Sequence, residues 1–149
     1  MKSIHPYLTF NGNCREAMVF YKNCLGGELS FQTTSWLIPY FVSQLPAKMK
    51  KYILHAELSN ENLILMASDI VSEKRLLKGN AISLLLNCKS EKEIKDCYQK
   101  LSTGGEQTHP LEETYWGALF GGLKDKYGNN WLLSYKRNRK NKRKQKLKT

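Results

Sequence analysis

One local pattern occurs twice in the sequence, and this repeat constrains the fold more than any other feature. In each copy a strand-length segment is followed by a helix-start motif, an amphipathic helix, a Gly-Gly pair and three further strand-length segments. An Asn or Ser with a Glu three residues later satisfies the first amides of a helix, and glycine supplies the left-handed residue that ends one. The residues that mark the copies are Asn13, Glu16, Gly26 and Gly27, and then Ser90, Glu93, Gly104 and Gly105.

Hydrophobic spacing places the elements within each copy. Apolar residues recur at i, i+3, i+4 and i+7 after each helix start, and this spacing predicts one buried stripe per helix. These stripes are Cys14, Ala17, Met18, Tyr21, Cys24 and Leu25, and then Ile94, Cys97, Tyr98 and Leu101. The predicted strands are 4–10, 28–34, 52–59 and 62–68 in the first copy, and 81–88, 106–111, 118–123 and 130–135 in the second.

One helix cannot cover both faces of a four-stranded sheet, so each copy needs another partner for its second face. The sequence therefore predicts an α+β fold, in which paired βαβββ modules form a curved eight-stranded sheet around a cavity with the helices outside. We expect a single domain over residues 1–135, with module one at 1–69, a linker at 70–79 and module two at 80–135.

Charge separates the end of the chain from its body. The net charge is +11, and residues 136–149 hold nine of the 24 Lys and Arg residues and no acid, which leaves 11 − 9 = +2 for the rest. Such a run is typical of a disordered basic tail. Nucleic acid is a possible partner for the tail, but the sequence has no base-reading module beside it.

The four cysteines, at positions 14, 24, 88 and 97, do not have the spacing of a zinc site, and we expect them to be reduced thiols. The first residues lack the apolar run of a signal peptide, and no stretch reaches the roughly 20 apolar residues of a membrane helix. We therefore predict a cytoplasmic protein with no membrane partner.

Several stretches also carry a family resemblance, which covers about residues 3–135. They are His5-Pro6-Tyr7-Leu8, residues 11–17, Phe20-Tyr21-Lys22, residues 25–28, His55-Ala56-Glu57-Leu58, residues 65–69, Trp116-Gly117 and residues 125–131. The chain resembles PhnB-like proteins of the vicinal oxygen chelate superfamily, which includes glyoxalase I, fosfomycin and bleomycin resistance proteins and extradiol dioxygenases. Some relatives carry the label 3-demethylubiquinone 3-methyltransferase. The resemblance implies paired βαβββ modules and commonly a homodimer.

The resemblance also allows a test for a metal. In metal-dependent members, four side chains from the first and last strands of the two modules hold one divalent ion. Here the first position falls on His5, whereas the others fall on Met66, on Ala81 or Ser83, and on Leu132. These three are poor ligands for a hard or borderline ion. We predict no metal and no cofactor, although His55 and Glu57 share one strand face and keep a different ligand set open.

Strand parity predicts the residues that line the cavity, because alternate side chains of a strand point to opposite faces. If Ile4, Leu8 and Phe10 pack under the helix, His5, Tyr7 and Thr9 face the cavity. The remaining predicted pocket residues are His55, Glu57, Met66, Ser68, Trp116, Asn130, Leu132 and Ser134. Trp116 and Trp131 have the shape to stack on a planar ligand, although aromatics at this spacing are more often core residues. Residues 35–51, with several aromatics, suggest a flap or a partner contact.

We interpret the chain as a protein that binds a small molecule, with no catalytic residue assigned and with His5, Tyr7 and His55 as candidate acid–base groups. Three alternatives stay open: a metal-dependent lyase or dioxygenase of glyoxalase type, a ligand-sequestering resistance-type protein without turnover, and nucleic-acid association through residues 136–149. The glycine pairs do not form a phosphate-cradling turn, so a methyltransferase has no support from motifs.

Overall fold

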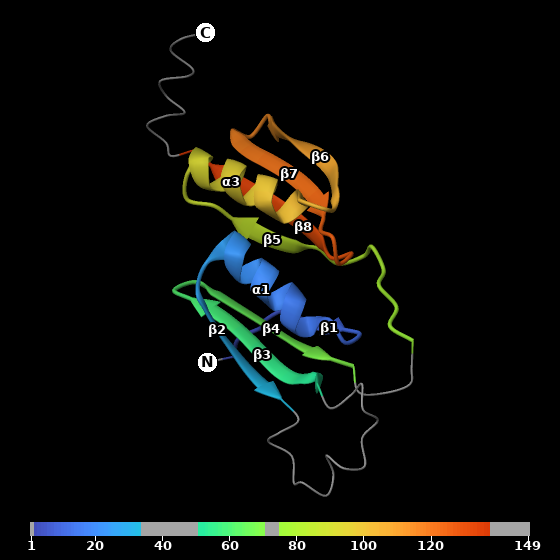
Figure 1. Ribbon diagram of the computed structural model, residues 1–149. Helices are drawn as coiled ribbons and strands as arrows, with labels where there is room; N and C mark the ends of the chain where they lie inside the picture. The colour runs from blue at the N-terminus through green and yellow to red at the C-terminus, as the bar shows by residue number, and fades with distance from the viewer. Residues whose placement is uncertain (1, 34–50, 71–74, 138–149) are drawn as a thin grey trace, which may run out of the picture. The chain divides into compact units, whose positions relative to one another are not determined.

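The computed structural model describes residues 2–33, 51–70 and 75–137, and these form two compact units (Figure 1). The units comprise Met1–Leu77 and Lys78–Thr149. The boundary lies inside the segment 70–79 that the sequence predicts as a linker. Each unit is a βαβββ module with one helix and one four-stranded sheet, so the predicted repeat and the α+β class are confirmed.

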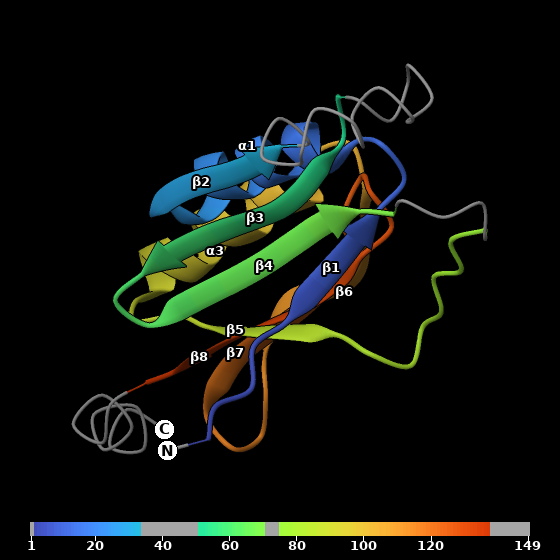
Figure 2. The ribbon, with the colours of Figure 1, turned by 90° about the horizontal axis from the view of Figure 1, so that it is seen from below.

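The first unit begins with strand β1 (Tyr7–Phe10) and helix α1 (Cys14–Leu25). Three strands follow, β2 (Glu28–Thr33), β3 (Ile53–Asn60) and β4 (Leu63–Asp69). The sheet order is β1-β4-β3-β2, visible in Figure 2, with β1 parallel to β4 and the other neighbours antiparallel. The chain thus returns its last strand to the centre of the sheet beside its first.

The second unit repeats this topology with different residues. Its elements are β5 (Leu84–Asn87), α3 (Glu91–Ser102), β6 (Glu106–Glu113), β7 (Ala118–Lys124) and β8 (Asn130–Lys136). The sheet order is β5-β8-β7-β6, with β5 parallel to β8.

Each core lies between a helix and one face of its own sheet. In the first unit, α1 buries Cys14, Ala17, Met18, Tyr21 and Cys24 against Phe10, Ala56, Leu58, Leu65 and Ala67. In the second, α3 buries Ile94, Tyr98 and Leu101 against Leu119, Leu123, Trp131 and Leu133. The buried Tyr98 hydroxyl has a hydrogen-bond partner, since it donates to the backbone oxygen of His109 at 2.7 Å. The predicted helical stripes are confirmed, except that Cys97 and Leu25 are only partly buried.

The two predicted helix-start motifs behave differently. The Ser90 hydroxyl accepts a hydrogen bond from the Glu93 amide at 3.0 Å, so this capping interaction is confirmed. Asn13 makes no side-chain cap hydrogen bond. Instead, Oδ1 of Asp69, at the end of β4, accepts from the Gly12 and Cys14 amides at 2.8 and 3.0 Å. A buried carboxylate from a distant strand has taken the role that the sequence suggested for Asn13.

The two Gly-Gly pairs have a shared steric cause. Gly26 and Gly104 have φ of 76° and 77°, in the left-handed region that glycine favours. The second glycine of each pair lies against a strand backbone. A Cβ on Gly27 would lie 2.7 Å from the Ser59 oxygen, and one on Gly105 would lie 2.2 Å from the Lys124 oxygen. Both positions therefore exclude a side chain.

Two first strands start later than the sequence suggested. β1 begins at Tyr7 and not at residue 4, since Pro6 has no amide to donate to the sheet. Ile4 precedes the strand and is 98% exposed, so its predicted packing under the helix is wrong. β5 begins at Leu84, opposite Trp131, where its partner strand has only just begun. Ala81 and Ser83 therefore lie outside the ladder.

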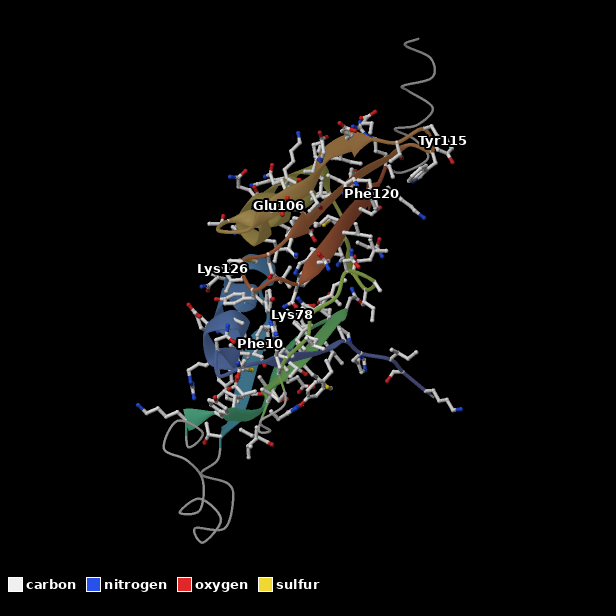
Figure 3. The ribbon with its side chains drawn as sticks, turned by 90° about the vertical axis from the view of Figure 1, so that its right-hand side faces the viewer. Phe10, Lys78, Glu106, Tyr115, Phe120 and Lys126 are labelled. Atoms are coloured by element: carbon white, nitrogen blue, oxygen red, sulfur yellow. The ribbon has the colours of Figure 1, made fainter. Side chains whose placement is uncertain are left out.

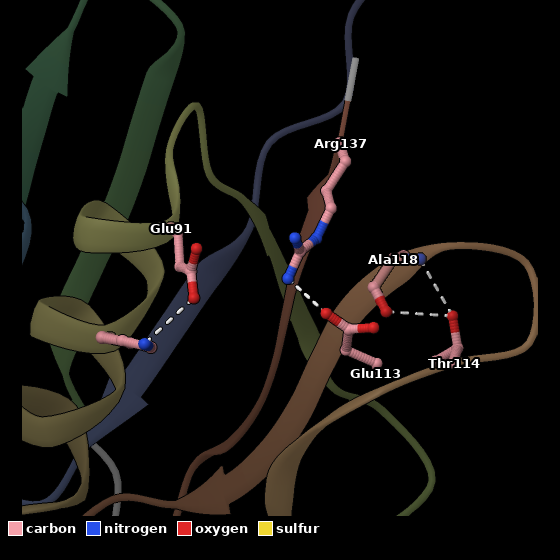
Figure 4. Close-up of polar contacts among 6 residues, drawn as sticks. Glu91, Glu113, Thr114, Ala118 and Arg137 are labelled. Atoms are coloured by element: carbon pink, nitrogen blue, oxygen red, sulfur yellow. Dashed lines mark hydrogen bonds and ion pairs between the residues drawn. The ribbon is translucent and has the colours of Figure 1, made fainter. Parts of the chain in front are cut away.

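The second unit ends with a strand and an ion pair. β8 continues through Lys136, and Arg137 pairs with Glu113 of β6 (Figure 4). Thr114 closes the β6–β7 turn with hydrogen bonds to Ala118, and Tyr115 stands at the tip of this turn (Figure 3). The rest of the predicted tail, 138–149, lies outside the described residues.

The segment predicted as a flap or partner contact, 35–51, lies outside the described residues except for Lys51. Its aromatic and proline residues Trp36, Pro39, Tyr40, Phe41 and Pro46 are all outside. Within the described parts of the chain, neither helix has the length and apolar character needed to cross a bilayer.

Candidate functional site

The first sheet has one face against α1 and a second face directed away from it, which we call the first distal face. Burial alternates along β4, where Leu65, Ala67 and Asp69 are buried while Ile64, Met66 and Ser68 are partly exposed. The predicted parity of this strand is therefore correct. The predicted site residues on the first distal face are Tyr7, Thr9, His55, Glu57, Met66 and Ser68.

A phenol and an imidazole meet on this face. The Tyr7 hydroxyl and His55 Nδ1 are 3.2 Å apart, and the ring centroids are separated by 5.8 Å. Tyr7 is half-exposed and His55 is partly buried. If the phenol donates to Nδ1, the other ring nitrogen carries the proton and points elsewhere. The pair can therefore pass a proton to a bound molecule or take one from it.

Strand register puts further functional groups beside this pair. Tyr7 lies opposite Met66, and Met66 lies opposite Glu57 on its other side. Thr9 lies opposite Ser68. One row of the face thus carries a phenol, a thioether and a carboxylate, next to a row with hydroxyl groups.

His5 differs from the other predicted site residues of this unit. It precedes β1 and is exposed. In the β1–β4 register, Tyr7 lies opposite Met66, and His5 precedes the ladder.

The second sheet has an equivalent face away from α3, the second distal face, and it is more apolar. Leu132 lies between Leu85 and Gly122 in the ladder. Of the other predicted residues, Asn130 donates to the Gly79 oxygen at 3.4 Å and Ser134 is buried, 8% exposed. Leu132 is only partly exposed.

The two predicted tryptophans have different environments. Trp116 is not on the sheet, because it lies in the β6–β7 turn, half-exposed, with its ring edge-on to Tyr115 at 4.9 Å. Trp131 is buried in the core, and its Nε1 donates to Asp125 Oδ2 at 2.8 Å. The core interpretation of Trp131 is therefore correct.

His109 is a residue to which the sequence assigned no role. A Cβ on Gly122 would lie 3.1 Å from Leu132 Cδ2 and 3.3 Å from His109 Nδ1, so the imidazole lies over Gly122 beside Leu132. Simple alternation could not have found it, since the β6–β7 register shifts on both sides of His109.

Sequence reasoning missed two buried aspartates, whose carboxylates accept hydrogen bonds from backbone amides. Asp69, 3% exposed, also accepts the Ile53 amide at 2.8 Å, so one carboxylate joins the starts of α1 and β3 to the end of β4. Asp125, 2% exposed, accepts the Tyr127 and Asn129 amides at 2.9 and 3.0 Å. The signal in the sequence was the position of each aspartate at the end of a strand. A carboxylate buried there must accept hydrogen bonds, because burying an unpaired charge is costly.

The side chains of each unit can be compared with the ligands that a metal ion needs. Within either unit, no three described His, Cys, Asp or Glu side chains gather into a group that could hold an ion. At two of the positions where the resemblance implies metal ligands, this chain carries Met66 and Leu132, whose side chains suit neither Mg²⁺ nor Zn²⁺. The residues present therefore do not fit the metal that the resemblance allows.

A comparison with models of known families shows which family the chain belongs to. Residues 2–134 match the model of the family described as 3-demethylubiquinone-9 3-methyltransferase. The chain belongs to this family. It is similar to Protein YjdN of Escherichia coli strain K12, with 27% identity over 139 residues that cover 88% of this chain and 93% of YjdN.

Solved structures of similar proteins support the same family relationship. The chain is similar to protein PA1353 from Pseudomonas aeruginosa, with a TM-score of 0.77, 36% identity and coverage of 93% of this chain and 100% of PA1353. A putative 3-demethylubiquinone-9 3-methyltransferase, PhnB protein, from Bacillus cereus has a TM-score of 0.72, 27% identity and coverage of 90% and 99%. The PhnB-like resemblance is thereby confirmed.

More distant structures share the fold alone. A glyoxalase/bleomycin resistance protein/dioxygenase family enzyme from Burkholderia phytofirmans has a TM-score of 0.59 at 12% identity, with coverage of 88% of this chain and 95% of that protein. This chain therefore has a glyoxalase/bleomycin resistance-like fold.

Proposed function

We propose that this chain binds a small organic molecule on its first distal face, without a metal ion. The Tyr7–His55 pair carries the proposal. In this contact, two groups able to exchange protons lie within hydrogen-bond distance of each other. A phenol, an imidazole, a carboxylate and a thioether on one sheet face form the mixed apolar and polar lining of a small-molecule site.

In this proposal the ligand is anchored by proton exchange and hydrogen bonds. Tyr7 and His55 hold or move a proton at an oxygen of the ligand, and Met66 supplies apolar contact. His5, at the exposed end of the same segment, is a further candidate donor. A reaction, where one occurs, is acid–base chemistry carried by these side chains.

The family description names a methyltransferase, and we favour binding over methyl transfer for a structural reason. A nucleotide-type cofactor with anionic groups is commonly held by amides at a helix start. At the start of α1 those amides are engaged by Asp69, and at the start of α3 the Glu93 amide is engaged by Ser90.

We further propose a cytoplasmic homodimer. The distal faces would otherwise leave strand side chains such as Tyr7 and Leu85, which are 50% and 56% exposed, in contact with solvent. Size-exclusion chromatography with light scattering tests the dimer, and a monomer at micromolar concentration contradicts it.

The test of binding combines thermal unfolding with NMR on the purified full-length chain. The probes are 2-oxo acids, catechols, hydroxamates and S-adenosylmethionine, each added separately. We expect one oxygen-bearing class to raise Tm and to shift the His55 imidazole signals, and Tyr7→Phe to weaken its binding about tenfold, as for loss of one hydrogen bond to a polar group. Lys22→Gln, on the exposed side of α1, is the matched control and should leave binding unchanged.

The outcomes separate the competing functions. Stabilisation without product indicates a sequestering protein, and product formation indicates an enzyme. Stabilisation by S-adenosylmethionine alone contradicts the preference for binding over methyl transfer. A divalent ion present at one per chain by elemental analysis, and lost in His5→Ala, contradicts the metal-free proposal.

A further inference from the structure

Two aromatic side chains are exposed in the turn between β6 and β7. Tyr115 is 97% exposed, at the tip of the turn, and Trp116 is 49% exposed (Figure 3). Their rings lie at 90° to each other, with the centroids 4.9 Å apart. Exposed apolar side chains are ordinary when they occur singly, whereas two adjacent rings in one turn favour a contact with another molecule.

Hydrogen bonds close this turn and fix the backbone that carries the rings. The Thr114 amide and hydroxyl both donate to the Ala118 oxygen, at 2.8 and 3.0 Å (Figure 4). The Gly117 amide donates to the Thr114 oxygen at 3.1 Å, and Gly117 has a φ of 84°, in the region that glycine favours. A bound molecule therefore does not have to order the turn before it contacts the rings.

The basic end of the chain leaves the sheet beside this turn. Lys136 is the last residue of β8 and lies opposite Ala118, the first residue of β7. Arg137 pairs with Glu113, the last residue of β6 (Figure 4). The aromatic turn and the start of the basic segment, residues 136–149, therefore lie at the same end of the second sheet.

The basic segment is strongly cationic. It holds nine Lys and Arg residues and no acid. Residues 138–149 lie outside the described residues, and a chain of this length, fully extended, reaches about 40 Å. At the turn itself, the Glu113 carboxylate is paired with Arg137, so its negative charge is compensated. A polyanion can therefore contact the rings and the cations of the basic segment at the same time.

We propose that this end of the second unit binds single-stranded nucleic acid, with Tyr115 and Trp116 stacking on bases and the basic segment contacting phosphates. Aromatic stacking together with a cationic track along the backbone gives single-strand binding without sequence preference, and such binding needs no base-reading module. The sequence placed Trp116 in the ligand site and gave the basic segment no aromatic partner. The structure brings the aromatic turn to the start of that segment.

This inference does not rest on the proposed ligand site. The turn is not part of either distal face, and it belongs to the second unit, whereas Tyr7 and His55 belong to the first. Loss of ligand binding in Tyr7→Phe would therefore leave the nucleic-acid proposal unaffected.

The chemistry of this region favours a single strand over other anionic partners. In a duplex the bases are stacked on one another, and exposing their faces to the rings costs a few kcal/mol. A lipid bilayer is a broad anionic plane, which would face the exposed Glu112 and Glu113 together with the rings. The basic segment also has Leu147 as its only apolar residue, so it has little to insert into a membrane.

The test of the rings is fluorescence anisotropy of a labelled oligothymidylate of about 16 nucleotides, titrated with the full-length chain. A duplex of the same length is the comparison. We expect Tyr115→Ala and Trp116→Ala each to weaken single-strand binding about tenfold, as for the loss of one stacked base, and to change duplex binding little. An oligouridylate of RNA should bind as the oligothymidylate does, because the proposed contacts are to phosphates and base faces.

Ile82→Ala is the matched control for the ring variants. Ile82 is 80% exposed and precedes β5, which pairs in parallel with β8 from Trp131 onward, so it lies near the opposite end of the sheet. This variant should leave single-strand binding unchanged. Because Tyr115 and Trp116 are exposed turn residues, thermal unfolding should give the same Tm for all three variants.

The test of the basic segment is the salt dependence of single-strand binding. The logarithm of the affinity falls with the logarithm of the salt concentration, with a slope of about −0.7 for each phosphate neutralised. The triple variant Lys142→Gln, Arg143→Gln and Lys144→Gln should therefore reduce the size of this slope by about 2. The control removes the same charge from exposed positions around α3, and it should leave the slope unchanged: Lys89→Gln, Lys92→Gln and Lys100→Gln.

Four results would overturn the proposal. The first is no binding of the oligothymidylate at about 50 mM salt, where electrostatic binding is strong. The second is equal affinity for single strand and duplex that neither ring variant changes, which would show a polycation acting alone. The third is ring-dependent binding to phosphatidylserine vesicles in place of the oligonucleotides, which would indicate a lipid surface. The fourth is loss of a dimer in Trp116→Ala with unchanged oligonucleotide affinity, which would make the turn a contact between copies of the chain.

Discussion

The two units share a topology and differ in chemistry, as the corresponding rows of their sheets show. In the first unit the row across β1, β4, β3 and β2 reads Tyr7, Met66, Glu57 and Ser30. In the second unit the row across β5, β8, β7 and β6 reads Leu85, Leu132, Gly122 and His109. One row carries a phenol and a carboxylate, and the other is aliphatic with an imidazole at its edge.

The comparison shows which positions the fold controls. Residues that face the helices are buried and apolar in both units, because each core must be filled. Residues on the distal faces do not fill a core within their own unit, so they are able to diverge. The difference makes the first distal face the better candidate for acid–base chemistry, whereas the second is the more apolar surface.

The largest expected effect tests whether the two buried aspartates are equivalent. Asp69 accepts amides up to 57 positions away, whereas the hydrogen bonds described above for Asp125 come from donors within six positions of it. Replacing either by Asn removes one acceptor oxygen and turns an amide group toward backbone donors. We expect Asp69→Asn to lower the free energy of unfolding by about 3 kcal/mol and Asp125→Asn by about 1.5 kcal/mol. Urea unfolding measures both changes, with Glu61→Gln as an exposed control. Equal losses of unfolding free energy would show that the two carboxylates contribute equally to stability.

The next effect tests the shared steric cause of the glycine pairs. Gly27→Ala and Gly105→Ala would each force a Cβ against a strand carbonyl oxygen, and we expect a loss of about 2 kcal/mol for each. Gly79→Ala is the control, since nothing lies within 4 Å of its Cβ and its φ is not positive. Thermal unfolding compares the three variants, and unchanged Tm values for the first two would refute the close approach.

The smallest effect tests the difference between the two helix starts. Ser90→Ala removes a capping hydrogen bond and should cost about 1 kcal/mol, whereas Asn13→Ala removes none and should cost less than about 0.5 kcal/mol. Denaturant titration followed by circular dichroism measures both. A larger loss for Asn13→Ala would mean that its side chain, and not Asp69, supports the start of α1.

The repeat, the helices and the face of each β4 and β8 residue could be predicted from the sequence, because they depend on local spacing. The parity that put Met66 and Ser68 opposite buried Leu65 and Ala67 is such a case. The same reasoning failed for Ile4, since Pro6 interrupts the ladder. It made no prediction for His109, where a register shift breaks the alternation.

Contacts between distant residues could not be predicted. Tyr7 and His55 were separately named as candidates, but their meeting depends on β4 lying between β1 and β3.

By itself, the amino-acid order determined that this chain builds the βαβββ unit twice, because hydrophobic period, caps and glycines act over a few residues. Only the tertiary structure decided that Asp69 would start α1 and that a phenol would meet an imidazole. Those outcomes depend on which strands become neighbours, and neighbouring strands are chosen by the packing of the whole unit.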